Sequence, residues 1–333
     1  MKKVIFDCDN TMGIDNRDID DGLALLYLIN NPDVELLGVT CTYGNEKLDY
    51  VYNQTLDLVK EIGADINVYK GRGGYTMHDY YASKYENNTS MEKEEVKKND
   101  AANFIVSMVN KYPGEVDILA TGSMQNLLDA GIIDTSVIAH TRQVVLMGGI
   151  TEALKFGDKT MKELNFSVCP EGAFEVLTQY SNVSVLTGNN CMDVEFSFDE
   201  LNDLKNKFAV KNHNLKNEFL IKKIEKWMNE FKNEYNQDSI VLWDVIAAIY
   251  LTNPELFDEQ FVGIKSKLSD FNNGFINIAE RRIENKRITS EDIFKMIETQ
   301  ENSFEELRSN VINIPTAIDS AIINKKMIEV VHG

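Results

Sequence analysis

The sequence predicts an α/β fold, in which an open and mostly parallel β-sheet carries helices on both faces. Two observations support this prediction. Short apolar runs rich in β-branched residues alternate with helix-like segments through residues 1–190, as in βαβ units around a buried parallel sheet. Nearly every run also ends in a polar or glycine-rich turn. Because ligands bind beside the carboxyl ends of the strands in such sheets, we expect these turns to converge on one crevice.

The apolar runs define the expected strands and the turns that follow them. The strands are Val4–Phe6, Leu36–Thr42, Ile66–Tyr69, Val116–Ala120, Gln143–Met147 and Val183–Leu186. The turns include Tyr43-Gly44-Asn45, Gly71-Arg72-Gly73-Gly74, Thr121-Gly122-Ser123, Gly148-Gly149 and Gly188-Asn189-Asn190. Residues 71–100 are polar, aromatic and charged without a clear period, so we expect a loop or lid over the crevice.

The C-terminal part of the chain is mainly helical. Helices are expected over Ser197–Phe208, His213–Tyr235 and Val241–Leu251, and the turn Asn272-Asn273-Gly274 predicts a hairpin within Val262–Ile283. We expect residues 1–333 to form a single domain. In it, residues 191–333 would add helices and small β elements that complete a site on the α/β core of residues 1–190.

The composition argues against several classes of partner. The 333-residue chain has 53 acidic and 34 basic residues, a net charge of −19, and such a field repels nucleic acid and anionic membranes. Its four cysteines show no CxxC spacing, which argues against a zinc site or a disulfide framework. We expect no signal peptide before the first strand, and no apolar run approaches the roughly 18 residues of a membrane span. We expect a cytoplasmic protein that binds a small neutral molecule or a cation.

Four aspartates mark the junction between the first strand and the first helix. Asp7 and Asp9 end the strand, and Asp20 and Asp21 open an apolar helix. One of Asp20 and Asp21 has a structural explanation as the helix N-cap. Four carboxylates at one junction repel one another unless a cation lies among them, and hard oxygen ligands favour Mg²⁺ or Ca²⁺. This stretch therefore predicts a divalent metal site.

Further motifs follow these aspartates in a fixed order. They are Gly44-Asn45, Thr121-Gly122 with Asn126, Val145-Leu146-Met147-Gly148-Gly149, Glu163-Leu164-Asn165 with Pro170-Glu171-Gly172-Ala173, and Trp243-Asp244. Together with Asp7-x-Asp9 and Asp20-Asp21-Gly22, this order resembles the inosine-uridine preferring nucleoside hydrolases over most of the chain. The resemblance implies hydrolysis of the N-glycosidic bond of a ribonucleoside to free base and ribose. It also implies a homodimer or a homotetramer.

The resemblance implies a Ca²⁺ ion held by Asp9, Asp21, Asp244 and the carbonyl oxygen of Thr121. Water and two ribose hydroxyls would complete its shell, and Ca²⁺ accepts about six to eight oxygen ligands in flexible geometry. By the same resemblance, Asp9 is the base that takes a proton from the metal-bound water. The metal would therefore activate the nucleophile and orient the sugar.

The same family pattern assigns the residues around the sugar. Asp20 and Asn165 would hold the 2′- and 3′-hydroxyls and Glu163 the 5′-hydroxyl, while Asn45 and Met147 would line the ribose pocket. Cleavage of the N-glycosidic bond builds positive charge on the sugar. A surrounding ring of carboxylates and amide oxygens stabilises that charge.

The residue before Asp244 bears on the choice of base. Many pyrimidine-accepting members have a histidine there, which can protonate the leaving base, whereas purine-specific members resemble this chain in having Trp243. An indole cannot act as a general acid, but it can stack on a purine, so we expect a preference for purine nucleosides. Leu164 stands where purine-specific members tend to have a second aromatic residue. Candidates for the missing aromatic or acid are Tyr75, His78, Tyr80 and Tyr81.

The chain departs from the family pattern at two places. Residues 10–19 lengthen the loop between Asp9 and Asp20, and this insertion offers Asp15 as an alternative to Asp20. We prefer Asp20 because the apolar helix begins directly after Asp21. The family also has an asparagine that reaches the 5′-hydroxyl from the loop before Glu163, and its nearest match here is Asp158.

Two other functions compete with this one. The stretch Ile5-Phe6-Asp7-Cys8-Asp9-Asn10-Thr11 also resembles the first motif of haloacid dehalogenase-like Mg²⁺ phosphatases, in which Asp7 would be the nucleophile and Asp9 the acid/base. That alternative leaves Trp243-Asp244 without a role. The chain could instead be a Ca²⁺-dependent nucleoside-binding protein whose catalytic activity has been lost.

Overall fold

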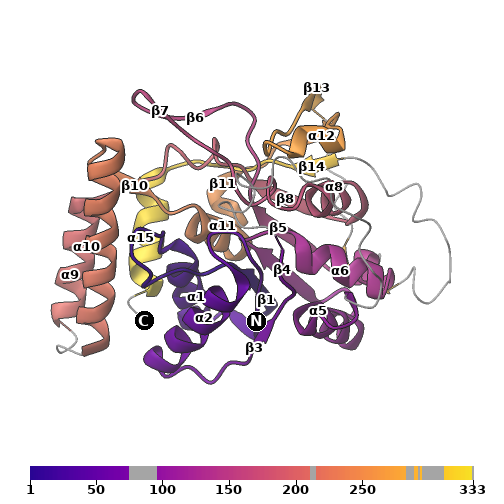
Figure 1. The fold of residues 1–333 in the computed structure, drawn as a ribbon, viewed down its shortest axis with the longest axis horizontal. Helices are drawn as coiled ribbons and strands as arrows, with labels where there is room; N and C mark the ends of the chain where they lie inside the picture. The colour runs from indigo at the N-terminus through magenta and orange to yellow at the C-terminus, as the bar shows by residue number, and fades with distance from the viewer. Residues whose placement is uncertain (75–95, 211–214, 283–288, 292, 295–310, 332–333) are drawn as a thin grey trace.

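The computed structural model describes residues 1–74, 96–210, 215–282, 289–291, 293–294 and 311–331. In this part of the chain the main sheet has nine strands in the order β13-β12-β14-β8-β5-β4-β1-β2-β3 (Figure 1). Its parallel strands are β1 (Lys2–Cys8), β2 (Val34–Cys41), β3 (Val68–Lys70), β4 (Val116–Ala120), β5 (Gln143–Met147), β8 (Val183–Leu186) and β14 (Val311–Asn313). This arrangement confirms the predicted fold class. The candidates Tyr75, His78, Tyr80 and Tyr81 lie outside the described residues.

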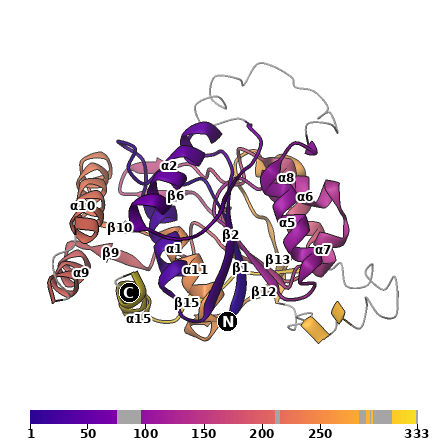
Figure 2. The same ribbon diagram turned by 90° about the horizontal axis from the view of Figure 1, so that it is seen from below.

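Helices cover both faces of the sheet (Figure 2). One core lies under α1 (Asp20–Asn30), α2 (Leu48–Ile62), α11 (Trp243–Thr252) and α15 (Ser320–Val331), with α9 (Phe198–Val210) and α10 (Leu215–Tyr235) outside them. The other lies under α5 (Asp100–Lys111), α6 (Gln125–Ile133), α7 (Ser136–His140) and α8 (Pro170–Gln179). None of the described helices is long and apolar enough to cross a membrane.

The register of the central strands places the site. In the parallel pairing of β1 with β2 and β4, Cys8 lies opposite Cys41 and Asp7 opposite Ala120. The residues that follow, Asp9 among them, therefore leave the sheet side by side at its carboxyl edge. All six predicted strands are present, and the predicted bounds of β4, β5 and β8 are confirmed.

The C-terminal part contributes strands as well as helices. The predicted helices correspond to α9, α10 and α11, and β14 inserts beside β8 in the main sheet. The predicted hairpin is formed by the antiparallel strands β12 (Phe261–Ile264) and β13 (Ile278–Arg282). The connection between the two strands is longer than the predicted turn, because the short helix α12 (Leu268–Phe271) precedes the Asn272-Asn273-Gly274 turn.

Three small sheets and a short helix complete the described chain. The sheets are β6 (Leu154–Phe156) with β7 (Lys159–Met161), β9 (Glu195–Ser197) with β10 (Ser239–Val241), and β11 (Phe257–Asp258) with β15 (Thr316–Ala317), and the 3₁₀ helix is η1 (Pro254–Leu256). The β6–β7 pair is a hairpin, and it lies beside the upper end of α10 (Figure 1).

A buried polar cluster attaches β14 to the rest of the sheet. The Asn313 side-chain amide donates to the Tyr250 hydroxyl at 2.7 Å and to Ser184 Oγ at 3.2 Å. Its Oδ1 accepts the backbone N–H of Gln260 at 2.9 Å. Asn313 and Ser184 are both buried, so loss of the amide would leave polar groups without partners.

We therefore expect Asn313→Ala to lower the free energy of unfolding by about 1–3 kcal/mol, because unsatisfied buried polar groups retain their desolvation cost. Urea unfolding followed by circular dichroism measures this loss. The matched control is Asn229→Ala on the exposed face of α10, which should cost less than about 0.5 kcal/mol. Equal losses in the two variants would contradict the role given to Asn313.

Candidate active site

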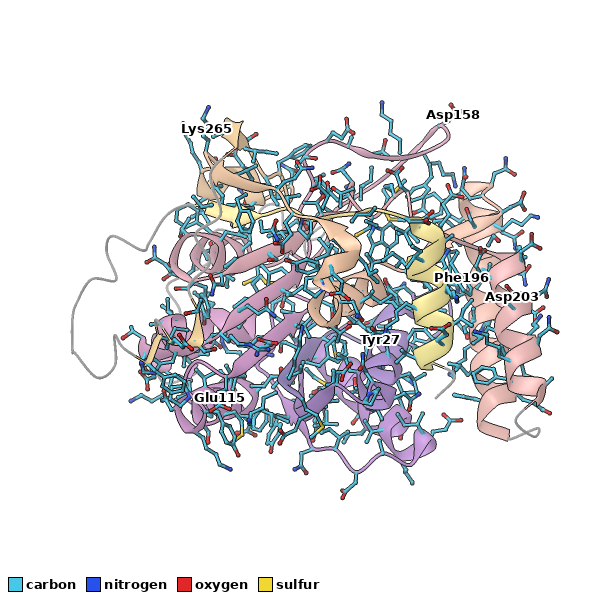
Figure 3. All side chains as sticks on the ribbon, turned by 180° about the vertical axis from the view of Figure 1, so that it is seen from behind. Tyr27, Glu115, Asp158, Phe196, Asp203 and Lys265 are labelled. Carbon is cyan, nitrogen blue, oxygen red and sulfur yellow. The ribbon has the colours of Figure 1, made fainter. Side chains whose placement is uncertain are left out.

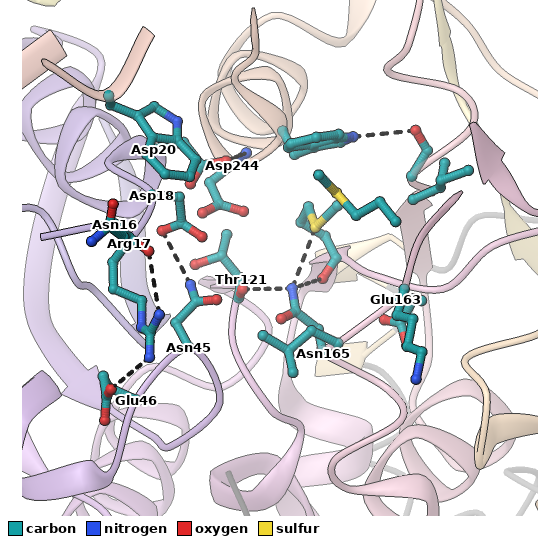
Figure 4. Close-up of a pocket in the computed structure, with 18 of the residues that line it drawn as sticks. Asn16, Arg17, Asp18, Asp20, Asn45, Glu46, Thr121, Glu163, Asn165 and Asp244 are labelled. Atoms are coloured by element: carbon teal, nitrogen blue, oxygen red, sulfur yellow. Dashed lines mark hydrogen bonds and ion pairs between the residues drawn. The ribbon is translucent and has the colours of Figure 1, made fainter. Parts of the chain in front are cut away.

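A pocket of about 790 Å³ opens at the carboxyl edge of the sheet. Its lining combines turns that follow strands, the starts of α1 and α11, the β6–β7 hairpin and the inner face of α10 (Figure 4). Of the residues predicted for the site, those lining the pocket are Asp20, Asn45, Thr121, Met147, Glu163, Asn165, Trp243 and Asp244. The expected convergence of the strand-end turns on one crevice is therefore found.

Two helix N-termini bring acidic residues to this region, of which Asp20 and Asp244 line the pocket and Asp21 does not. Asp20 and Asp21 belong to the first turn of α1, and Asp244 to the first turn of α11. The N-cap positions are occupied by Ile19 and Leu242, without side-chain capping bonds. The prediction that Asp20 or Asp21 acts as the N-cap is thus wrong. Neither carboxylate is used as a cap, and the positive ends of the helix dipoles favour both negative charges.

Asp9 is fully buried and held on one side by the turn after β2. Its Oδ2 accepts the backbone N–H of Asn45 at 2.7 Å, and its Oδ1 accepts the Asn45 side-chain amide at 3.3 Å. Gly44 makes this approach possible, because a Cβ there would lie 2.0 Å from Asp9 Oδ2. The glycine and the asparagine of this turn therefore fix the carboxylate that the sequence assigned as the base.

The inserted loop contributes an acid that the sequence analysis did not select. Asp18 lines the pocket, and its Oδ1 accepts bonds from Asn45 Nδ2 at 3.2 Å and Thr11 Oγ1 at 3.1 Å. Asp15, the alternative to Asp20, has a side chain that is 76% exposed and paired with Lys226 on α10. Asp15 therefore lies outside the pocket and Asp20 inside it.

The clustered carboxyl groups perturb one another. Burial, with repulsion from neighbouring aspartates, raises the pKa of Asp9 to about 7 and that of Asp18 to about 8. Burial also raises the pKa of Asp20 to about 6. The pKa values of Asp21 and Asp244 lie well above the ordinary value, first because of burial and then because of the neighbouring acids. Adding positive charge would relieve this repulsion.

The donor set at this position fits a hard divalent cation. Asp21 Oδ1 accepts the Thr121 hydroxyl at 2.6 Å, while its buried Oδ2 has no hydrogen-bond partner. The neighbouring donors are carboxylate oxygens and the Thr121 carbonyl, which are ligands that Mg²⁺ and Ca²⁺ prefer. In the described part of the chain, no group of three or more His, Cys, Asp or Glu side chains is arranged so that it could hold a metal ion. The chemistry of the donors, rather than a preformed cage, therefore supports a metal site.

Opposite the acids, the hydrogen bonds of one side-chain amide fix another wall of the pocket. Asn165 Nδ2 donates to the carbonyl oxygens of Thr121 at 2.7 Å and Met147 at 2.9 Å. The Met147 sulfur lies 3.3 Å from the same amide nitrogen. These bonds join the ends of β4 and β5 to the segment before α8. Asn165 is thereby held in one orientation beside the acids.

Glu163 lies on the other side of the pocket from Asp18 and Asp20 (Figure 4). Its carboxylate accepts the backbone N–H groups of Gly149 at 3.0 Å, Phe166 at 2.8 Å and Ser167 at 3.0 Å. Gly274 packs against it, since a Cβ there would lie 2.0 Å from Oε2. The side chain predicted for the 5′-hydroxyl thus also organises the local backbone.

An aromatic and apolar surface forms the other half of the pocket. Trp243 contributes from the start of α11, Trp227 and Tyr235 from α10, and Leu154 and Met161 from the β6–β7 hairpin. Sequence analysis selected only Trp243. The α10 residues recur along one side of a helix that was recognised, but helical periodicity does not reveal which neighbour that side meets.

The first aspartate of the opening motif has a structural role. Asp7 is fully buried, and its Oδ1 accepts Thr40 Oγ1 at 2.5 Å and Asn126 Nδ2 at 2.7 Å. Asp7 is not among the residues that line the pocket. Asp9 and Asp21 are likewise absent from that lining. The hydrogen bonds of Asp7 to Thr40 and Asn126, and not its place relative to the pocket, therefore indicate the structural role.

Asp129 on α6 is another buried acid with a structural role. Its carboxylate accepts Arg72 Nε at 2.5 Å, Asn99 Nδ2 at 2.8 Å and Gln125 Nε2 at 2.9 Å. Arg72 follows β3 and Asn99 caps α5. The two ends of the intervening chain are therefore fastened to the same side chain.

Asp158, the weaker candidate for the 5′-hydroxyl, does not belong to the site. It is exposed at the tip of the β6–β7 hairpin, where it points into solvent (Figure 3). It is absent from the pocket lining in the described chain. The hairpin turn, which Gly157 enters with a φ of +59°, carries Asp158 away from the pocket.

The fold and the pocket together define an α/β protein with a carboxylate-rich pocket at the carboxyl edge of its sheet. The family model described as inosine-uridine preferring nucleoside hydrolase matches residues 4–306. The chain belongs to this family, which confirms the resemblance found in the sequence. It is therefore a nucleoside hydrolase, an N-glycosyl hydrolase of ribonucleosides, and the phosphatase alternative is wrong.

Individual relatives agree with this family. Uridine nucleosidase 1 of Arabidopsis thaliana is 28% identical over 249 residues, which cover 72% of each chain. A solved plant nucleoside hydrolase has a TM-score of 0.73 at 18% identity and covers 100% of this chain and 99% of its own. A purine-preferring ribonucleoside hydrolase from Gardnerella vaginalis also has a TM-score of 0.73, at 16% identity, covering 100% and 98%. These two structures share the fold.

The raised pKa values of the acid cluster predict how the free energy of unfolding depends on pH when a chelator removes divalent cations. The folded-state pKa of Asp9 is about 7 against an ordinary value of 3.8, so the folded chain binds more protons than the unfolded chain between these values. Stability in chelator should therefore fall as pH rises through this window. Replacing one acid by its neutral isostere, Asp21→Asn, should raise the melting temperature in chelator at pH 8.

Differential scanning calorimetry at several pH values measures this effect. Asp158→Asn at the exposed hairpin tip is the matched control and should leave the melting temperature unchanged. If Asp21→Asn instead lowered the melting temperature in chelator at pH 8, the carboxylates would not be repelling one another as described.

Proposed function

We propose that the chain is a Ca²⁺-dependent ribonucleoside hydrolase that prefers purine nucleosides. The observation that carries the metal requirement is the buried oxygen cluster at the starts of α1 and α11, in which Asp21 Oδ2 has no partner. Asp9, Asp21, Asp244 and the Thr121 carbonyl would hold the cation. Oxygen donors in a flexible arrangement suit Ca²⁺. When bound, the cation would act as a Lewis acid on the attacking water and would orient the ribose diol.

In this proposal Asp9 accepts the proton of the attacking water. Its two bonds from Asn45 leave the carboxylate fixed in orientation, which a general base requires. Asp20 and Asn165 line the pocket on either side of Thr121 (Figure 4), and they would hold the 2′- and 3′-hydroxyls. The surrounding carboxylates stabilise the positive charge that develops on the sugar as the bond to the base breaks.

The preference for purines rests on Trp243. Its indole N–H is engaged by the Gly188 carbonyl at 3.2 Å, so the residue offers the pocket an aromatic surface rather than a proton. No histidine is among the described residues that line the pocket. A larger aromatic base gains more from stacking on an indole, and protonation of the leaving base would come from solvent.

Replacement of the proposed base is the direct test of the mechanism. Asp9→Asn should reduce kcat by at least about a hundredfold, because general bases contribute about 10²–10⁴ in rate. Asp244→Ala should likewise abolish ribose release. The matched control is Asp15→Asn, which alters an exposed aspartate of the same loop and should leave kcat unchanged. Full activity in Asp9→Asn would remove Asp9 from its role.

A reducing-sugar assay tests the substrate and the metal together. With inosine, guanosine, adenosine, uridine and cytidine, the purine nucleosides should give the higher kcat/KM. A chelator should abolish activity and added Ca²⁺ should restore it. Comparable turnover of uridine and inosine would contradict the purine preference. If a nucleoside raised the melting temperature in Ca²⁺ but was recovered intact, the chain would be a binding protein without catalysis.

A further inference from the structure

We propose that Phe156 is a positioning residue for the nucleobase: it fixes the aromatic wall of the pocket without touching the ligand. This inference rests on the proposed function, and it assigns a role to the β6–β7 hairpin. Phe156 is buried but does not line the pocket. Two of its aromatic neighbours do, one on α11 and one on α10.

The geometry of the cluster places Phe156 at its centre. Phe156 and Trp243 pack edge to face, with ring centroids 6.3 Å apart and ring planes at 89°. Phe156 also lies 5.4 Å from the ring of Tyr235 and 5.3 Å from that of Phe231. Edge-to-face contacts have a preferred orientation, so each constrains the tilt of its partner. In this way Phe156 joins the start of α11 to the inner face of α10.

The β6–β7 hairpin positions the Phe156 ring. Leu154 and Phe156 are buried while Lys155 between them is exposed, as expected of a strand with one covered face. The two-residue turn Gly157-Asp158 returns the chain so that Phe156 pairs with Lys159. Lys159 donates to the Glu234 carbonyl near the end of α10.

A hydrogen bond fixes the remaining freedom of Trp243. Its Nε1 donates to the Gly188 carbonyl, and Gly188 packs on the hairpin, because a Cβ there would lie 2.8 Å from Leu154 Cδ1. The turn after β8 therefore holds the indole through its N–H group, and the Phe156 ring holds it through an edge-to-face contact. Without the Phe156 ring the hydrogen bond would remain, but the indole plane would be free to tilt about it.

The kinetic test uses Phe156→Leu, which removes the ring but keeps a buried apolar side chain. The KM for inosine should rise about two- to tenfold, the range of an aromatic pair contact, with kcat within about twofold. Phe156→Tyr keeps the ring and should restore the KM. The matched control is Phe257→Leu, because Phe257 is buried and packs edge-to-face on Tyr250 at 5.2 Å and 85°, and neither ring lines the pocket. This control should leave the KM unchanged.

A spectroscopic test does not depend on catalysis. The chain has two tryptophans, so Trp227→Phe leaves Trp243 as the sole tryptophan, whose fluorescence is excited selectively over that of the tyrosines. In that background Phe156→Leu should increase acrylamide quenching of Trp243, and Phe257→Leu should not. If the wild-type chain released no ribose from any nucleoside, the proposed function would fail while quenching still decided the role of Phe156. A KM or a quenching constant for Phe156→Leu equal to that of Phe257→Leu overturns the inference.

Discussion

Mutual repulsion among buried carboxylates is the constraint on which the site depends. The turn after β1 and the first turns of α1 and α11 bring Asp9, Asp20, Asp21 and Asp244 together in one buried cluster. Burial first, and then the neighbouring acids, raises the pKa of each of these groups. The fold supplies partial compensation through two helix N-termini and the Asn45 turn. Under the proposed function, a cation and the positive charge that forms on a ribose would provide what is missing, so the same electrostatic imbalance would serve binding and catalysis.

The two halves of the pocket are built by different means. The acidic side consists of strand ends and helix starts of the parallel sheet, where backbone pairing fixes the position of the chain. The aromatic side consists of side chains from α10, α11 and the β6–β7 hairpin, which meet through ring packing and the hydrogen bond from Lys159 to the Glu234 carbonyl. Specificity for the base can therefore change by substitutions that leave the catalytic acids in register.

The difference between these halves explains what the sequence could predict. Asp9 and Thr121 follow apolar strands, and the carboxyl ends of parallel strands must meet at one edge, so their convergence was predictable. Asp18 was missed because its position depends on the path of the inserted loop, which Thr11 and Asn45 hold through their side chains. Trp227 was missed because the periodicity of α10 describes a helix but not its neighbour. For the same reason Phe156, on a short hairpin, carried no recognisable signal.

Asp129 on α6 holds two segments that lie far apart in the sequence. Arg72, which follows β3, and Asn99, which caps α5, both donate hydrogen bonds to its carboxylate. That carboxylate is itself buried. One side chain of α6 thus joins the end of β3 to the start of α5, and its loss would release both elements at once.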